Sequence, residues 1–409
     1  MKVLISAMYC KPNSGSEQAY GWWWATELST RHDVTVVTGA AQRDDIEAAI
    51  TADPSLRRVR FVYVPTTGDQ SASGTENRFE RIGQYIWQLR AMRTVRRLVQ
   101  TESFDLAHHV TTGTWRQPSC LLASGLPYAM GPMAGSERLP PGFARTFGWR
   151  AFVRETIRNT AIAAARLDPL IQLTLRRSRT IVAAGTLTHS EMTHRFPAKV
   201  TTLTQVFPHP AIGPGQIGAR EWRDGEPLRM SWVGRLVPSK GLPLLLRAMA
   251  DSRLAGSTVD VMGTGPELES LQTLAADLGL EDRVNFCGHV GQEELFDRIR
   301  SSHLFVFTSL QELMGQALSE AMQLGAGCVV FDWSGGSVLA GDHGAEKISV
   351  GRPNEASADL ADALVSIVDE GRVGELQDRA RKRIDELIGG ESPLDRIENL
   401  YARVTSARS

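Results

Sequence analysis

Cysteine and long apolar runs are both scarce in this 409-residue sequence. Four scattered cysteines without any CxxC spacing exclude the usual zinc and disulfide patterns; they are Cys10, Cys120, Cys287 and Cys328. No run of 18 consecutive apolar residues occurs, so we expect no transmembrane helix. The first apolar run, in MKVLISAMYC, is too short for a secretory signal peptide. We therefore expect a cytoplasmic protein with buried thiols.

The composition indicates a globular protein large enough for two domains. Hydrophobic residues make up 42% and charged residues 22% of the chain, and the net charge is −1. This balance hides an asymmetry, because residues 1–205 carry 25 Lys and Arg against 16 Asp and Glu, whereas the remainder carries 20 against 30. Two halves of opposite sign indicate different roles, with the basic half suited to an anionic surface or acceptor.

Alternating strand and helix patterns predict an α/β fold of two doubly wound domains. The first domain is expected over residues 1–207, on the acceptor side. A stretch rich in proline and glycine, PHPAIGPGQIG, predicts a linker at 208–218. The second domain, which we expect to bind the nucleotide, covers 219–388. The remaining residues, 389–409, predict a terminal helix.

The segment 309–336, SLQELMGQALSEAMQLGAGCVVFDWSGG, predicts the centre of the site. Apolar strands expected at 304–307 and 328–331 flank it and make a βαβ unit. Glu312 falls in the loop after the first strand, where ligands of open α/β sheets bind. Glu320 lies on a helix that begins near Gly315, and eight helical residues separate the carboxylates by about 12 Å. The pair should contact different parts of one long ligand, and the helix N-terminus suits an anion.

A second loop, GRLVPSKG at 234–241, follows an expected strand at 228–233. Its cations, Arg235 and Lys240, predict a clamp for a diphosphate, since arginine grips phosphate oxygens in pairs and lysine acts as a point charge. Structural ion pairing is the alternative interpretation.

The first domain offers two loops of its own. A strand at 1–9 runs into the turn NSGS and then into a helix, which is typical of a phosphate-binding start; a plain strand-to-helix turn is the alternative. A strand expected at 105–110 carries His108 and His109, whose imidazoles should point to opposite faces of the sheet. We expect His109, nearer the strand's end, to face the crevice; a purely structural role is the alternative.

These motifs, in this order, resemble family 4 of the retaining glycosyltransferases, whose GT-B fold sets two Rossmann-like domains around a central cleft. In the E-x7-E motif of that family, matched by Glu312 and Glu320, the first glutamate faces the donor sugar and the second holds the ribose. The resemblance implies that Arg235 and Lys240 bind the diphosphate and that His109 lies beside the sugar and the acceptor hydroxyl. It also implies further donor contacts at Gly15, Ser16, Gly234, Gly288, Val290, Gly315, Gln316 and Ala317.

The resemblance also implies a reaction, the retaining transfer of a sugar from a UDP- or GDP-linked donor to a hydroxyl of a glycan, glycolipid or small molecule. No cofactor, metal or nucleic acid is expected, and no D-x-D triplet occurs in the sequence. The terminal helix should pack back onto the first domain. An epimerase or phosphorylase of the same architecture, or a non-catalytic protein that binds nucleotide sugars, would share most of these motifs.

The helix expected at 78–100 contains six arginines and a single acid, Glu80. Such a helix either docks on an anionic membrane, at its inner face and next to a lipid-linked acceptor, or presents an ordinary solvated surface.

Overall fold

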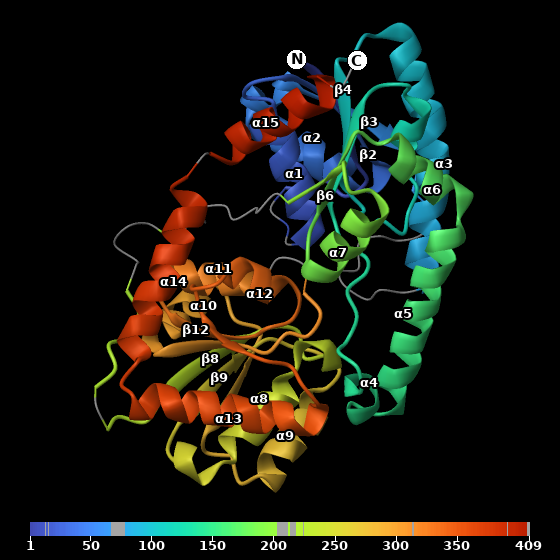
Figure 1. Ribbon diagram of the computed structural model, residues 1–409. Helices are drawn as coiled ribbons and strands as arrows, with labels where there is room; N and C mark the ends of the chain where they lie inside the picture. Colours follow the sequence, from blue (N-terminus) through green and yellow to red (C-terminus); the bar gives the residue numbers. More distant parts are fainter. Residues whose placement is uncertain are drawn as a thin grey trace.

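Two parallel β-sheets with helices packed on both faces form the chain (Figure 1). The computed structural model describes residues 1–12, 14, 16–66, 78–202, 212, 218–223, 225–312, 315–390 and 392–406. Most of the linker expected at 208–218 therefore lies outside the described residues. Within the described ranges, no helix is both long and apolar enough to cross a membrane.

The N-terminal sheet has the strand order β3-β2-β1-β4-β5-β6-β7, with every pairing parallel. The chain lays β2 and β3 on one side of β1 and then crosses to place β4 on the other side. Ligands bind at such a switch point in open α/β sheets. The strands are β1 (Lys2–Ala7), β2 (Asp33–Gly39), β3 (Val59–Val64), β4 (Leu106–Thr111), β5 (Tyr128–Met133), β6 (Thr180–Ala183) and β7 (Val200–Thr201).

The C-terminal sheet repeats this topology in the order β10-β9-β8-β11-β12-β13, again parallel throughout. Its switch point lies between β8 and β11, the strands that precede the two motifs GRLVPSKG and SLQE. The topology thus brings together two loops that are about 70 residues apart in the sequence. The strands are β8 (Arg229–Val233), β9 (Thr258–Met262), β10 (Val284–Gly288), β11 (Leu304–Phe307), β12 (Gly327–Phe331) and β13 (Glu346–Ile348).

A break in the helices of the N-terminal half falls at Asp168. Its carboxylate accepts hydrogen bonds from the N–H groups of Leu170 and Ile171 and so caps a new helix that starts at Pro169. The helices are α1 (Ser16–Leu28), α2 (Arg43–Ala52), α3 (Arg78–Thr101), α4 (Phe143–Thr146), α5 (Trp149–Leu167), α6 (Pro169–Arg177) and α7 (Thr186–Arg195).

The C-terminal half contains three helices, α8, α10 and α12, that the sequence patterns did not predict. Two of them are only seven or eight residues long, which is too short for a clear periodic signal. The helices are α8 (Leu242–Met249), α9 (Leu268–Asp277), α10 (Gln292–Ser301), α11 (Gln316–Gln323), α12 (Ser334–Ala340), α13 (Pro353–Asp369), α14 (Val373–Ile388) and α15 (Pro393–Ser406).

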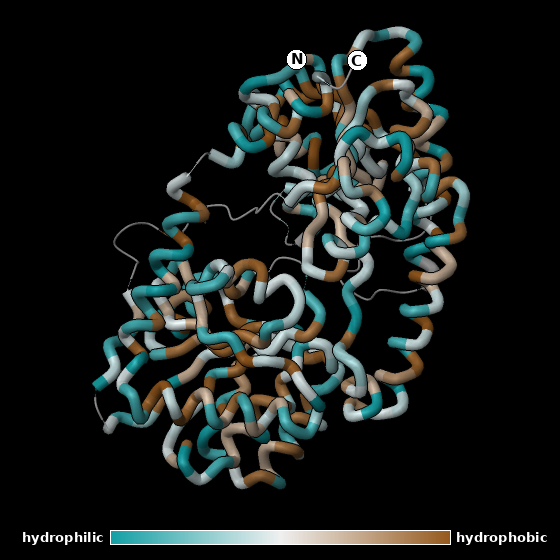
Figure 2. Tube along the Cα trace, viewed as in Figure 1, coloured by the Kyte–Doolittle hydropathy of each residue, from teal (hydrophilic) through white to brown (hydrophobic). Residues whose placement is uncertain are grey.

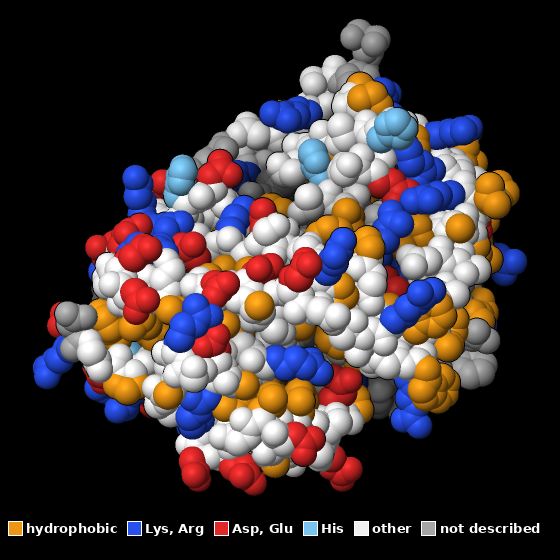
Figure 3. Space-filling model, turned by 60° about the horizontal axis from the view of Figure 1, so that its bottom comes forward, with side chains coloured by type: hydrophobic (Ala, Val, Ile, Leu, Met, Phe, Trp, Pro, Cys, Tyr) orange, Lys and Arg blue, Asp and Glu red, His pale blue; other side chains and the backbone are white. Residues whose placement is uncertain are grey.

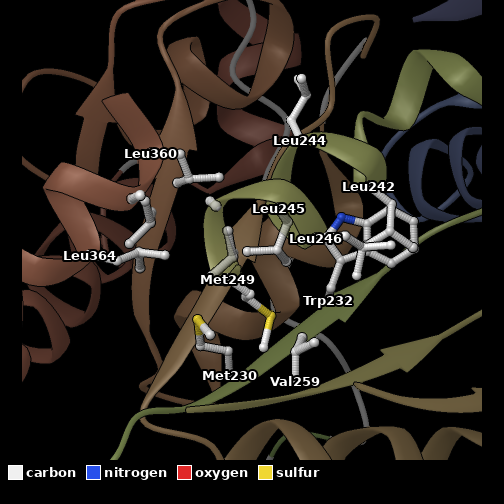
Figure 4. Close-up of a cluster of buried hydrophobic side chains, with 14 of the residues drawn as sticks. Met230, Trp232, Leu242, Leu244, Leu245, Leu246, Met249, Val259, Leu360 and Leu364 are labelled. Atoms are coloured by element: carbon white, nitrogen blue, oxygen red, sulfur yellow. The ribbon is translucent and has the colours of Figure 1, made fainter. Parts of the chain in front are cut away.

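Each sheet separates two apolar cores, as expected for parallel strands that are buried on both faces. Hydrophobic residues run through both sheets, whereas α5 alternates between hydrophobic and hydrophilic residues (Figure 2). One face of the C-terminal sheet packs under α8 and α13, where Leu245 and Met249 meet Trp232 and Leu364 (Figure 4). This packing fixes β8 and therefore the position of the loop that follows it.

The terminal helix α15 packs on the N-terminal sheet although it follows the C-terminal half in sequence (Figure 1). Its buried residues Ile397, Leu400, Tyr401 and Val404 recur at helical spacing and join the core under β1 and β4. The Tyr401 hydroxyl also lies 3.0 Å from Nδ1 of His108. These contacts tie the end of the chain to the N-terminal half.

A second connection runs in the opposite direction. Phe143 of α4, from the N-terminal half, is fully buried in the core of the C-terminal half, with Leu139 in the same cluster. Next to it, the Trp333 indole donates a hydrogen bond to the carbonyl of Arg138. Helix α5 starts at this anchor and extends back to α6, so it spans both halves of the molecule (Figure 1).

Candidate active site

A large cleft of about 2060 Å³ lies between the two halves, and residues of both line it. From the C-terminal half it is lined by Arg235, Gln311 and Glu312 and by the first turns of α11. From the N-terminal half it is lined by α1, α3 and α5 and by the loops after β4 and β5. Both switch points therefore open into one cleft.

The loops after β8 and β11 are joined by backbone contacts. Leu310 N–H donates to the carbonyl of Ser239, and the Thr308 hydroxyl donates to the carbonyl of Lys240. Gly241 has a left-handed backbone with φ of 67°, and a Cβ there would collide with the carbonyl oxygen of Thr308. Only glycine allows the two loops to approach this closely.

This approach brings together two residues that we predicted for the site, Lys240 and Glu312. The Lys240 ammonium forms an ion pair with Oε2 of Glu312, and the two side chains are 22% and 19% exposed. Lys240 itself does not line the cleft, whereas Glu312 and Arg235 do. The lysine expected to bind phosphate is thus held by the glutamate expected to face the sugar.

Glu320 lies on α11, on the same wall of the cleft as Glu312. The residue is 8% exposed, and its carboxylate accepts a hydrogen bond of 2.9 Å from Nε2 of Gln316. Burial raises the pKa of Glu320, and the hydrogen bond from Gln316 partly opposes the shift. Gly315 caps the helix in a left-handed conformation, so the free N–H groups of α11 open toward the cleft. Leu313 and Met314 lie outside the described residues.

Several predicted donor contacts do not line the cleft. Gly234 donates its N–H to the carbonyl of Met262, at the end of the neighbouring strand. Gly288 ends the edge strand β10, and Val290 and Ala317 pack against the core on that side of the sheet. None of these four is among the residues that line the cleft, and their role in donor binding stays a prediction.

The turn before α1 falls partly outside the described residues, which leaves out Gly15 and the side chain of Ser16. Their neighbours Ser14 and Glu17 line the cleft. Oε1 of Glu17 accepts a hydrogen bond from the N–H of Gly113 in the loop after β4. Glu17 therefore joins the two N-terminal loops that we predicted to form this rim.

The prediction that His109 faces the cleft requires correction. The two imidazoles do point to opposite faces of the sheet, but both are buried and neither lines the cleft. The His109 ring nitrogens lie 3.1 Å from the Thr112 hydroxyl and 3.0 Å from the Ser119 hydroxyl. The reason is that β4 extends to Thr111, one residue beyond the expected end, so Thr112 and Gly113 form the rim instead.

Burial also fixes the charge state of both histidines. Loss of hydration lowers the pKa of His109 to about 4 and that of His108 to about 3. Both imidazoles are therefore neutral at physiological pH. In this position His109 can hold Thr112 in place at the cleft surface, but its nitrogens do not reach the cleft.

Sequence reasoning missed the contact that connects the two walls of the cleft. Nε2 of Gln311 donates a 3.0 Å hydrogen bond to Oε2 of Glu155, on α5. The other oxygen of Glu155 accepts from the N–H of Leu139, so a carboxylate that is 8% exposed joins three segments. A buried acid on an amphipathic helix gives no sequence signal for this role.

Comparison with known proteins agrees with this architecture. The crystal structure of the Anabaena protein HepE in complex with UDP has a TM-score of 0.64 to this chain at 16% identity, covering 99% of this chain and 100% of that one. Sucrose-phosphate synthase from Thermosynechococcus elongatus gives 0.64 at 15% identity, with 99% of each chain covered. The chain has the GT-B fold.

A match to a sequence family lies in the C-terminal half of this GT-B protein. Residues 220–386, which contain β8–β13, Glu312 and Glu320, match the family described as "Glycosyl transferases group 1". The D-inositol 3-phosphate glycosyltransferase of Streptomyces avermitilis is 27% identical over 277 residues, which are 61% of this chain and 59% of that enzyme. A GDP-mannose-dependent mannosyltransferase of Mycobacterium tuberculosis that acts on phosphatidylinositol monomannoside is 38% identical over 78 residues, 19% of this chain and 20% of the relative.

Proposed function

We propose that the protein is a retaining glycosyltransferase that moves a sugar from a nucleoside diphosphate donor to an acceptor hydroxyl. The observation that carries this proposal is that the Lys240–Glu312 ion pair lies at the switch point, with Arg235 and Glu320 lining the same cleft as Glu312. The match of this half to the group 1 glycosyltransferases and the names of its relatives support the same activity. A UDP- or GDP-linked donor is the class that we expect.

Departure of the nucleoside diphosphate builds negative charge on its terminal phosphate. Arg235 lies at the cleft surface, where its guanidinium can bind those oxygens, and the N-terminus of α11 adds the partial positive charge of its free N–H groups. Fixed positive groups of this kind stabilise the transition state more than the ground state. The bond from the anomeric carbon to the diphosphate oxygen breaks as a bond to the acceptor oxygen forms, and the departing diphosphate oxygen takes the proton of the acceptor hydroxyl.

Donor binding changes the partner of Lys240 in this proposal. The diphosphate competes with Glu312 for the ammonium, and a lysine that turns to the phosphate leaves the Glu312 carboxylate to face the sugar. A carboxylate there stabilises the positive charge that develops on the sugar ring. Glu320, farther along α11, is then the residue that binds the ribose.

The proposal is tested first on the donor. A panel of UDP-, GDP- and ADP-sugars is screened by thermal shift, because a ligand that binds only the folded state raises the unfolding temperature. The stabilising donor is then mixed with candidate acceptors, and release of nucleoside diphosphate is measured with and without EDTA. We expect release that depends on an acceptor and persists in EDTA, with the anomeric configuration retained in the product. Donor turnover without any acceptor would favour an epimerase, and tight binding without turnover would favour a binding protein.

A further inference from the structure

Helix α5 presents a row of exposed apolar side chains to the cleft. Trp149, Val153 and Ile157 follow each other at four-residue spacing and are 73%, 44% and 49% exposed. The residues that bury α5 against the protein are different ones, Ala151, Glu155, Ile162 and Ala165. The helix therefore has a second apolar face, and no described part of the chain covers it.

Helix α3 lines the same cleft with further apolar residues. Ile82 is 53% exposed, and Tyr85 and Ile86 lie within one turn of it. Single exposed hydrophobic residues are common on protein surfaces and need no explanation. A group of them gathered on two helices around one cleft is a different matter, because contiguous apolar surface marks a binding site.

Arginines accompany these apolar residues along α5. Arg150, Arg154 and Arg158 recur at four-residue spacing, directly beside the apolar row, and line the same cleft. The edge of the molecule where α3 and α5 run shows Lys and Arg side chains interleaved with hydrophobic ones (Figure 3). Guanidinium groups bind phosphate oxygens in a fixed bidentate geometry. The surface combines an aliphatic wall with groups that recognise phosphate.

The surface and the predicted donor site line the same cleft. Glu155, on the buried face of α5 away from the apolar row, holds Gln311 by a 3.0 Å hydrogen bond, and Gln311 immediately precedes Glu312. This contact places α5 beside the loop that would face the donor sugar. A free sugar or glycan offers mainly hydroxyl groups and would leave the aliphatic side chains in contact with water.

We propose that this surface is an acceptor groove that binds an amphiphile with a phosphate or diphosphate head and a hydrocarbon chain. The groove is formed by the apolar residues Ile82, Ile86, Trp149, Val153 and Ile157 and by the arginines Arg150, Arg154 and Arg158. The inference rests on the proposed function and names its acceptor class as lipid-linked. The arginines hold the phosphate, and the chain lies along the apolar row of α5. The sugar or alcohol to be modified then projects toward Glu312.

Binding without a donor tests the groove separately from the reaction. The probe is farnesyl phosphate, below its aggregation concentration and without vesicles, titrated against the full chain by calorimetry. Farnesol and inorganic phosphate separate the contributions of chain and head, and a short-chain phosphatidic acid separates a prenyl from an acyl source. We expect both amphiphilic phosphates to bind at least tenfold more tightly than farnesol or phosphate alone, about 1.4 kcal/mol.

Matched variants locate the site. The double variant Val153→Ser with Ile157→Ser should weaken farnesyl phosphate about tenfold, because it removes buried methyl groups from the complex. Leu167→Ser changes an equally apolar, 83% exposed residue of the same helix that does not line the cleft, and it should have no effect. Arg150→Gln with Arg154→Gln should weaken farnesyl phosphate but not farnesol, whereas Arg97→Gln, an exposed arginine of α3 outside the cleft, should change neither.

The outcomes also separate the two proposals. Farnesyl phosphate that binds no better than phosphate, or that is weakened equally by Leu167→Ser, overturns the acceptor groove. If UDP and GDP bind and a water-soluble acceptor is glycosylated in that case, the proposed function stands without the groove. If farnesyl phosphate binds as described but no nucleoside diphosphate binds and no sugar is transferred, the groove stands and the glycosyltransferase function is wrong.

Discussion

Neutralising Glu312 should tighten the binding of a nucleoside diphosphate, although Glu312 belongs to the predicted donor site. Its carboxylate holds the Lys240 ammonium, and both side chains are partly exposed, at 19% and 22%. Such a pair contributes about 1 kcal/mol, the upper end of the range for solvent-accessible ion pairs. Glu312→Gln keeps the shape of the side chain and removes this competition, so the dissociation constant should fall about fivefold.

The double variant shows whether the two residues compete. A charged hydrogen bond to phosphate contributes about 1.5–3 kcal/mol. In the wild-type background, Lys240→Ala should weaken diphosphate binding by about 1 kcal/mol less than this full contribution. The variant has no Lys240–Glu312 ion pair that the ligand must break when it binds. With Glu312→Gln already present, Lys240→Ala should show the full loss. The coupling energy of the cycle is therefore expected to be about 1 kcal/mol.

Calorimetric titration with UDP and GDP measures the wild type and the three variants, and uridine and guanosine report contacts that do not involve the phosphates. Lys382→Ala, an exposed lysine of α14 away from the cleft, is the matched control and should bind like the wild type. Weaker diphosphate binding in Glu312→Gln, or a cycle without coupling, would refute the exchange of partners by Lys240. Equal losses for nucleoside and diphosphate in Lys240→Ala would refute the phosphate clamp itself.

The remaining predictions concern the ribose contact, the buried histidines, the anchor between the halves and the arginine-rich helix. Glu320→Gln should mainly raise the apparent dissociation constant of the donor, whereas Glu312→Gln should mainly lower kcat. Steady-state kinetics separate these two effects. A kcat of Glu312→Gln within about threefold of the wild-type value would contradict the role of Glu312. The pKa of His109 is lowered to about 4 and that of His108 to about 3, so the unfolded chain binds protons first as the pH falls below 6.5. The melting temperature should therefore decline between pH 6.5 and about 4, and His109→Asn should make this decline shallower; an unchanged slope would show that the histidine is not responsible. Phe143→Ala should lower the free energy of unfolding by about 3–5 kcal/mol in a denaturant titration, because it leaves a cavity in the C-terminal core where Phe143 is fully buried. A decrease of less than about 1 kcal/mol in this free energy would show that α4 is not anchored there. The exposed arginines of α3 should bind anionic vesicles in a salt-sensitive way, with about 1 kcal/mol of binding free energy for each charge near the surface. Co-sedimentation with vesicles measures this binding before and after substitution by glutamine at Arg90, Arg93, Arg96 and Arg97. Co-sedimentation that changes neither with lipid charge nor with these substitutions would show that α3 is an ordinary solvated helix.

Local patterns were sufficient for most of the elements and for the fold class. The strand Leu304–Phe307 is a short apolar run bounded by polar turns, and its limits agree with the prediction. The break at Asp168 is also local, because a capping acid followed by proline acts within one turn of helix. The short helices α8 and α12 were not predicted, because seven or eight residues show too little periodicity to distinguish a helix from a loop.

The placement of Arg235, Glu312 and Glu320 in one cleft could also be expected from the sequence. Each residue follows a strand or opens the next helix, and parallel strands deliver their carboxyl ends to the same edge of a sheet. The position of His109 could not be judged in the same way. A strand that extends by one residue moves the rim from His109 to Thr112, and sequence patterns do not fix strand ends to within one residue.

Short-range periodicity and turn chemistry were enough to predict the alternation of strands and helices, the α/β class and the motifs of the predicted donor site. Which side chains meet became clear only from the tertiary fold. The ion pair of Lys240 with Glu312, the Gln311–Glu155 contact across the cleft and the burial of Phe143 in the opposite half join residues 72, 156 or roughly 100 positions apart. Contacts at such separations follow from how two sheets and their helices pack in space, and packing geometry leaves no periodic trace in the chain.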